Sequence, residues 1–278
     1  MADTDAQNNF AFRYQHGEGV MVDKRKAVEL YKSAANQGHP DAQNNLGFCY
    51  QHGEGVAADK KKAVEFYTLA TNQGHPDAQN NLGFCYQHGE GVAADKFRAV
   101  EFYTAAANQG HPDAQNNLGF CYQHGEGVAM DKKRAVELFN LAANQGHPDA
   151  QNNLGFCYQH GEGVRPSKKR AISLYGSAAI QGHLSAQNNL AFCYQHGKGV
   201  ETNKQKAVEL YTLAADQGYP DAINNLAYCY QHGVGVTTDK RKANELYASA
   251  ASQGHQQAQH QLSLLKVAAH KKAHCCIV

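Results

Sequence analysis

The chain repeats itself every 36 residues, and this period constrains the fold more than any other feature. An alanine marks the same position of each copy, at Ala6, Ala42, Ala78, Ala114, Ala150, Ala186, Ala222 and Ala258. A period of about 20–50 residues is typical of solenoids, in which each unit packs only on its neighbours. We therefore predict seven repeats over residues 5–256 of the 278-residue chain.

Each repeat carries the signals of two helices joined by turns. In residues 41–76, Ala42, Leu46 and Cys49 recur with helical spacing. Gly53 is suited to end this helix, because glycine readily adopts the left-handed backbone conformation. The second helix has a side chain suited to cap its first turn in every copy: Asp23, Asp59, Asp95, Asp131, Ser167, Asn203 and Asp239. The sequence thus predicts an all-α protein, an α/α solenoid of seven helix–turn–helix repeats.

Both ends of the array depart from the repeat as capping units do. Arg13 takes the place of the repeat cysteine in the first copy, where no preceding unit covers that face. Residues 257–270 resemble a first helix, with Lys266 at the position of the repeat tyrosine. Because terminal units of a solenoid need polar outer faces, we predict a capping helix over 257–270 and a flexible tail over 271–278.

Charge and hydropathy exclude several classes of protein. Lysine and arginine number 26 against 25 acidic residues, and we see no basic stripe, so we expect no nucleic-acid partner. No apolar run approaches the roughly 20 residues of a membrane span. The amino terminus lacks the basic and apolar regions of a secretory signal. We expect a cytoplasmic protein.

Six of the eight cysteines occupy one position per repeat: Cys49, Cys85, Cys121, Cys157, Cys193 and Cys229. Equivalent positions on stacked helices should lie about 8–10 Å apart, whereas a disulfide needs Cα atoms within about 7 Å. We predict buried, reduced thiols. A histidine follows each of these cysteines three residues later, but a structural zinc site needs four ligands. We therefore predict no metal and no cofactor.

The repeat resembles the Sel1-like repeat (SLR) family, relatives of the tetratricopeptide repeats. The matching residues of the second copy are Ala42, Leu46, Gly47, Tyr50, Gly53, Gly55, Val56, Asp59, Lys62, Ala63, Phe66, Tyr67, Ala70 and Gly74. Thr71, Ala191 and Ala227 depart from the family pattern. The resemblance implies a right-handed superhelix and a role as an adaptor or scaffold. A secreted, β-lactamase-like branch of the family pairs two cysteines in each repeat, whereas this chain has one.

A stripe on the first helices, away from Ala42 and Leu46, is the candidate partner-binding surface. It comprises Asn44, Phe48, Gln51, Asn80, Phe84, Gln87, Asn116, Phe120, Gln123, Asn152, Phe156, Gln159, Phe192 and Tyr228. The resemblance places first helices on a concave face, where aromatic anchors flanked by amides could hold an extended peptide. Alternatively, each aromatic ring packs against the neighbouring first helix.

The chain ends in a motif unlike the repeats. Cys275, Cys276 and Ile277 match a prenylation box, with Lys266, Lys271 and Lys272 upstream. We predict lipidation at Cys275, with Cys276 as a second site for a lipid. The alternative is an unmodified tail.

No catalytic set stands out. We interpret the recurring Gly-His-Pro-Asp as a turn signature without a chemical role, because Tyr219 replaces the histidine in one copy. We predict a non-enzymatic scaffold that binds a protein partner and is tethered to the cytosolic face of a membrane. It would be a eukaryotic adaptor or a bacterial effector acting in a host cell. The alternatives are a β-lactamase-like enzyme and a soluble, unmodified scaffold.

Overall fold

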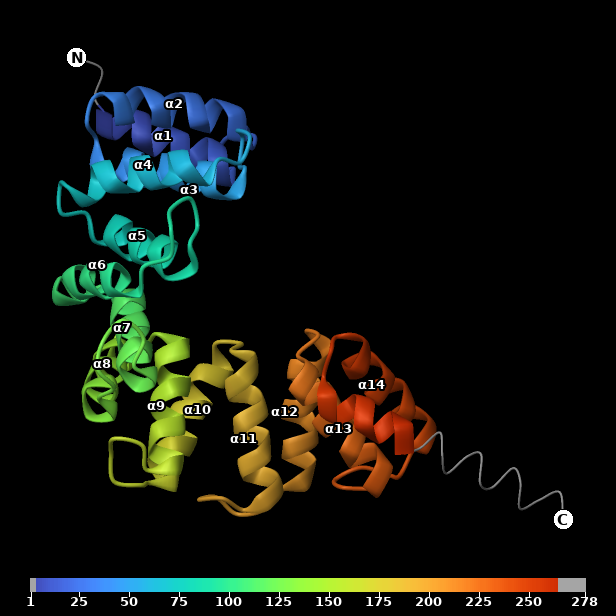
Figure 1. Ribbon diagram of the computed structural model, residues 1–278. Coiled ribbons are helices and arrows are strands. Elements are labelled where there is room, and N and C mark those ends of the chain that lie inside the picture. The colour runs from blue at the N-terminus through green and yellow to red at the C-terminus, as the bar shows by residue number, and fades with distance from the viewer. Residues whose placement is uncertain (1–3, 265–278) are drawn as a thin grey trace, which may run out of the picture. The chain divides into compact units, whose positions relative to one another are not determined.

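The computed structural model describes residues 4–264, which form helices joined by short turns. The helices are α1 (Thr4–His16), α2 (Lys24–Asn36), α3 (Pro40–His52), α4 (Lys60–Thr71), α5 (Pro76–His88), α6 (Lys96–Asn108), α7 (Pro112–His124), α8 (Lys132–Asn144), α9 (Pro148–His160), α10 (Lys168–Ile180), α11 (Leu184–His196), α12 (Lys204–Asp216), α13 (Pro220–His232) and α14 (Lys240–Ser252) (Figure 1). A last helix begins at 256 and is described to 264. The predicted all-α class and repeat architecture are confirmed.

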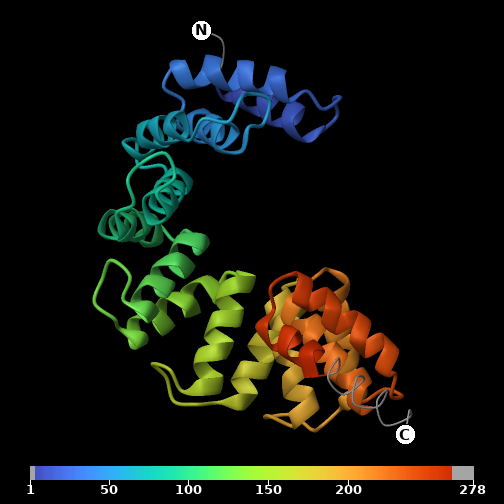
Figure 2. The ribbon, with the colours of Figure 1, turned by 45° about the vertical axis from the view of Figure 1, so that its right-hand side comes forward.

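The chain divides into two compact units, residues 1–145 and 146–278. The first holds α1 to α8, and the second holds α9 to α14 and the last helix. Within each unit the two helices of a repeat pack together, and the second helix also packs on the first helix of the next repeat (Figure 2). Each unit is therefore an α/α solenoid. The rest of the predicted capping helix, the tail, Cys275 and Cys276 lie outside the described residues.

The helix ends follow the predicted capping chemistry. Asp59 accepts a hydrogen bond from the backbone N–H of Lys62, and its counterparts from Asp23 to Asp239 cap their helices in the same way. Gly53 ends α3 in the left-handed region at φ 72°, which a residue without Cβ adopts at little cost. Local sequence thus fixes where the helices begin and end.

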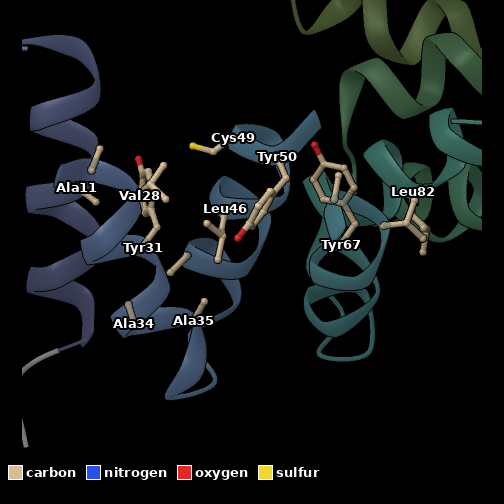
Figure 3. Packing of buried hydrophobic residues seen from close by; sticks show 14 of the residues in the cluster. Ala11, Val28, Tyr31, Ala34, Ala35, Leu46, Cys49, Tyr50, Tyr67 and Leu82 are labelled. Carbon is tan, nitrogen blue, oxygen red and sulfur yellow. The ribbon is translucent and has the colours of Figure 1, made fainter. Parts of the chain in front are cut away.

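The core is built from small residues packed around one large ring per repeat. Tyr67 of α4 is fully buried (Figure 3). Ala63 and Ala70 of the same helix have no exposed surface. The ring lies directly against Gly47 on α3, where an added Cβ would meet it at 2.7 Å. Alanine and glycine therefore let the two helices approach closely enough to enclose the tyrosine.

The repeat cysteines are buried, as predicted, and none of the six forms a disulfide. Burial raises the pKa of the Cys121 thiol to about 11 and that of Cys85 to about 12. A thiol is much less reactive than its thiolate, so these side chains behave as small apolar core residues.

Candidate functional site

An aromatic ring stands at the same position on every first helix and lies tilted against the ring of the histidine one turn later. We call these rings the aromatic stripe: Phe12, Phe48, Phe84, Phe120, Phe156, Phe192 and Tyr228. The ring centroids lie 4.2–4.4 Å from those of the paired histidines. A spacing of four residues brings two side chains together on one helix face, so each histidine fixes the position of its aromatic ring.

The rings of the stripe are half-exposed, with one exception. Phe48 is 40% exposed and Phe156 is 38% exposed, whereas fully buried anchors such as Tyr67 define the core. Phe192 is more covered, because the ammonium of Lys198 lies 4.5 Å from its ring centroid. The stripe therefore presents apolar surface at regular intervals within each unit. Its role in partner binding stays a prediction.

The asparagines of the predicted site are engaged between repeats. Asn44 Oδ1 accepts a hydrogen bond from Asn81 Nδ2 at 3.0 Å, and Asn80 and Asn152 accept equivalent bonds from Asn117 and Asn189. Asn116 is half-buried like Asn80. Asn44 itself is only 8% exposed. These amides thus hold adjacent first helices in register, a role that the helical periodicity alone did not reveal.

The glutamines of the predicted site belong to a second network, which we call the tyrosine relay. In the second repeat, the Tyr67 hydroxyl donates to Gln51 Oε1 at 2.7 Å, and Gln51 Nε2 donates to Glu90 of the next repeat at 2.9 Å. Lys60 Nζ lies 2.7 Å from the same carboxylate. These hydrogen bonds hold the pKa of Glu90 below its ordinary value. Gln87 occupies the corresponding place in the third repeat.

The relay is incomplete in the fourth, fifth and sixth repeats, and in the fourth Phe139 stands in place of the tyrosine. Lys198 and Val234 stand where earlier repeats have the acceptor glutamate. Gln159 therefore lacks that carboxylate, and its Nε2 lies 3.2 Å from His160 instead. The hydroxyls of Tyr175 and Tyr211 are buried without a hydrogen-bond partner. Such orphaned groups are uncommon in folded proteins and mark repeats that depart from the common design.

The Gly-His-Pro-Asp segments do more than form turns. His75 Nδ1 accepts the N–H of Ala78 and so caps α5, while His75 Nε2 lies 2.7 Å from Asp41 in the first turn of α3, the preceding first helix. The sequence interpretation as a simple turn missed this contact. In the sixth repeat Ser185 and Tyr219 replace the aspartate and histidine, and their hydroxyls are 3.0 Å apart. The aspartate and the histidine are thus replaced together, and the contact between the starts of two successive first helices is kept.

The described residues include no candidate metal site and no candidate membrane span. Over residues 4–264 no group of three or more histidine, cysteine, aspartate or glutamate side chains is placed to hold a metal ion. The six repeat cysteines form no disulfide, whereas the β-lactamase-like branch pairs two cysteines in each repeat. None of the helices described over the same range is long and apolar enough to span a lipid bilayer.

Comparison with known families and structures agrees with this architecture. The Sel1 repeat family model matches seven consecutive segments, residues 4–39, 40–75, 76–111, 112–147, 148–183, 184–219 and 220–255. The comparison with curated proteins gives no match.

Among solved structures, the chain is similar to a protective antigen of uropathogenic Escherichia coli strains that displays an SLR fold. Identity is 35% and the TM-score 0.75, over 94% of this chain and 56% of the antigen, so the chain spans little more than half of that protein. A Sel1 repeat protein from Oxalobacter formigenes is 34% identical, with a TM-score of 0.75 over 95% of this chain and 77% of its own. An immunity protein from Pseudomonas aeruginosa, at 24% identity and a TM-score of 0.53 over 80% of this chain and 83% of its own, shares the fold.

Proposed function

The chain belongs to the Sel1 repeat family, whose members generally mediate protein–protein interaction, and on that premise we propose that it is a non-enzymatic scaffold. It binds an extended segment of a protein partner along the aromatic stripe. The proposal is supported chiefly by one observation: a half-exposed ring, in tilted contact with a histidine, recurs at the same position of successive first helices.

The stripe suits an extended segment because its anchors are spaced and pre-positioned. Aromatic side chains contribute strongly to interfaces, since they bury a large apolar area and have few rotatable bonds. Each histidine holds its ring in place before a partner arrives, so little conformational entropy is lost on binding. A partner with apolar side chains at regular intervals therefore fits better than an irregular one.

Site-specific photo-cross-linking tests this proposal. A photoreactive phenylalanine analogue replaces Phe84 on the stripe or, as the control, Phe97, which is 73% exposed on α6 and outside the stripe. We expect a discrete cross-linked partner from Phe84 alone. The triple variant F48A/F84A/F120A should then bind that partner at least ~10-fold more weakly. Equal cross-linking from both positions, or unchanged affinity with a large fall in melting temperature, would favour the packing alternative.

We further propose that the scaffold is tethered to the cytosolic face of a membrane through Cys275. The support is the sequence motif alone, because Cys275 and Cys276 lie outside the described residues. A single isoprenoid gives only marginal membrane binding, so Cys276 and the upstream lysines would supply the second signal.

Two measurements test the tether. Intact mass of the protein from eukaryotic cells should show an added isoprenoid, and a fluorescent fusion with a free carboxyl terminus should concentrate at membranes. Cys275→Ser should remove both effects. An unmodified mass would leave a cytoplasmic scaffold without an anchor.

A further inference from the structure

A groove of about 490 Å³ opens in the second unit between α10 and α12, over α11. Gly176 and Ile180 of α10 form one side, Leu210 and Leu213 of α12 the other, and Gln187 of α11 also lines it. Its volume is in the range of small ligand pockets and of clefts that accept a few side chains of a partner. The groove is formed mainly by second helices and contains no residue of the aromatic stripe.

Gly176 departs from the repeat in a way that the fold does not require. The same position holds Thr68, Thr104, Asn140 and Thr212 in other repeats. Glycine inside a helix costs about 1 kcal/mol relative to alanine. A Cβ at Gly176 would meet nothing within 4 Å, unlike one at Gly47. The missing side chain therefore serves no internal packing and leaves the groove open.

Ile180 is the second departure, one turn along the same helix. It is 89% exposed, whereas the first four repeats place asparagine there, at Asn36, Asn72, Asn108 and Asn144. Across the groove, Leu213 is 53% exposed. Two large aliphatic side chains thus face water on either side of the gap left by Gly176, which is an arrangement expected of a contact surface.

Gln187 provides independent evidence that a hydrogen-bond donor is missing from the groove. Its counterparts Gln43, Gln79, Gln115 and Gln151 each accept a hydrogen bond from the glutamine that follows the next second helix. Gln217, which should supply this bond, donates to the Leu213 carbonyl instead. Gln187 is 5% exposed, and its Oε1 has no partner. The groove therefore has an acceptor without an internal donor.

The fifth repeat, which contributes α10 to the groove, is also more basic than the repeat before it. Residues 148–183 contain four basic and two acidic residues, whereas residues 112–147 contain three basic and four acidic residues. On α10, Ser173 replaces the glutamate found in the six other second helices, so that helix has three basic residues and no acidic one. Lys206 of α12 lies at the groove, 4.7 Å from the ring centroid of Tyr194. An acidic partner complements this charge.

We propose that this groove binds a segment of a protein partner in which acidic residues flank aliphatic or aromatic ones. An apolar side chain enters over Gly176, between Ile180 and Leu213. A donor of the segment serves Gln187, and its carboxylates pair with Lys206 and the basic first turn of α10. This interface is separate from the aromatic stripe. The groove can therefore bind a partner even if the stripe does not, and the stripe can bind one even if the groove does not.

Selection from a library of displayed peptides tests the proposal. The full chain is the target, and the peptides take the place of the unidentified partner. Displayed random peptides of about 12 residues, roughly three helical turns, are selected on the wild-type protein and counter-selected on G176T/I180N. Both substitutions restore residues found at these positions in other repeats. We expect the surviving peptides to be acidic and to contain two or more large apolar residues. Survivors that are basic or lack apolar residues, or the absence of any survivor, would overturn the proposal.

Affinity measurements on a selected peptide localise the site. Gly176→Thr and Ile180→Asn should each weaken binding by ~10-fold with no fall in melting temperature. Ala248→Thr, the same position on α14, is the matched control and should leave affinity unchanged. F48A/F84A/F120A should also leave it unchanged, which separates this site from the stripe. If anionic phosphatidylglycerol vesicles compete with the peptide for wild-type protein but not for G176T, the groove is a lipid site and the proposal is wrong.

Discussion

His75 Nε2 lies 2.7 Å from Asp41 Oδ1, although 34 residues separate them in the chain. The other ring nitrogen of His75 accepts the backbone N–H of Ala78 at 3.2 Å. An imidazole that accepts at Nδ1 and donates at Nε2 is the neutral tautomer. One side chain thus caps a helix and joins its start to that of the preceding first helix. His39, His111, His183 and His255 make the same contact within their units.

Removal of one such cap should lower stability measurably. We expect His111→Ala to reduce the free energy of unfolding by about 1–2 kcal/mol, because α7 loses its cap and Asp77 loses its hydrogen bond. His111→Asn keeps a capping side chain but is too short to reach Asp77, so it should cost less. Urea denaturation followed by circular dichroism measures both. Equal losses for the two variants would show that the helix cap contributes nothing.

The same contacts predict how stability depends on pH. The hydrogen bond from His111 lowers the pKa of Asp77 below its ordinary 3.8, and His183 does the same for Asp149. A carboxyl whose pKa is lower in the folded state stabilises the fold above the unfolded-state pKa, and this stabilisation is lost as pH falls through the folded-state value. Stability should therefore fall as the pH drops below about 4. Asp77→Asn should flatten this dependence, and an unchanged slope would contradict the assignment.

Two glycines with similar backbone angles should respond differently to substitution. Gly91 has φ 73° and Gly74 has φ 83°, so alanine is strained at both. At Gly91 an added Cβ would also overlap the carbonyl of Lys60 in the preceding repeat, whereas at Gly74 it would meet nothing. We expect Gly74→Ala to cost about 1–2 kcal/mol and Gly91→Ala several kcal/mol. Similar melting temperatures for both variants would refute close contact at that turn.

The tyrosine relay predicts opposite outcomes for one substitution in two repeats. Tyr67→Phe removes a bonded hydroxyl and leaves Gln51 without its donor, so it should cost about 1 kcal/mol or more. The Tyr175 hydroxyl has no partner, so Tyr175→Phe should leave stability unchanged or raise it. Phe139 already occupies this position in the fourth repeat. Thermal unfolding of both variants provides the comparison, and a larger loss for Tyr175→Phe would contradict the relay.

The helices and their caps could be predicted because their causes are local. A cap such as Asp59 bonds an N–H three residues away, and Gly53 ends its helix by its own backbone angle. The burial of Cys121 followed from spacing on one helix face. Because the sequence repeats every 36 residues, the prediction made for one repeat applied to all seven.

The contacts between repeats were harder to predict, because periodicity assigns a residue to a face without showing what covers that face. Asn44 lies away from Ala42 and Leu46, yet the next first helix covers it and bonds its side chain. The replacement of a histidine by Tyr219 looked like the loss of a role until the structure placed Ser185 beside it. The groove at Gly176 depends on three helices and could not be predicted from any one of them.

Where it is complete, the tyrosine relay joins a repeat only to the next repeat of the same unit. A substitution such as Lys198 therefore disrupts a single junction, and Tyr67, Gln51 and Glu90 keep their hydrogen bonds. Because the energy of a solenoid is a sum over neighbouring units, a loss at one junction is not multiplied along the array. Individual repeats are thus free to diverge in sequence while the others maintain the fold. In a modular array of this kind, mutations can change the surface of one repeat while the other repeats keep their structure.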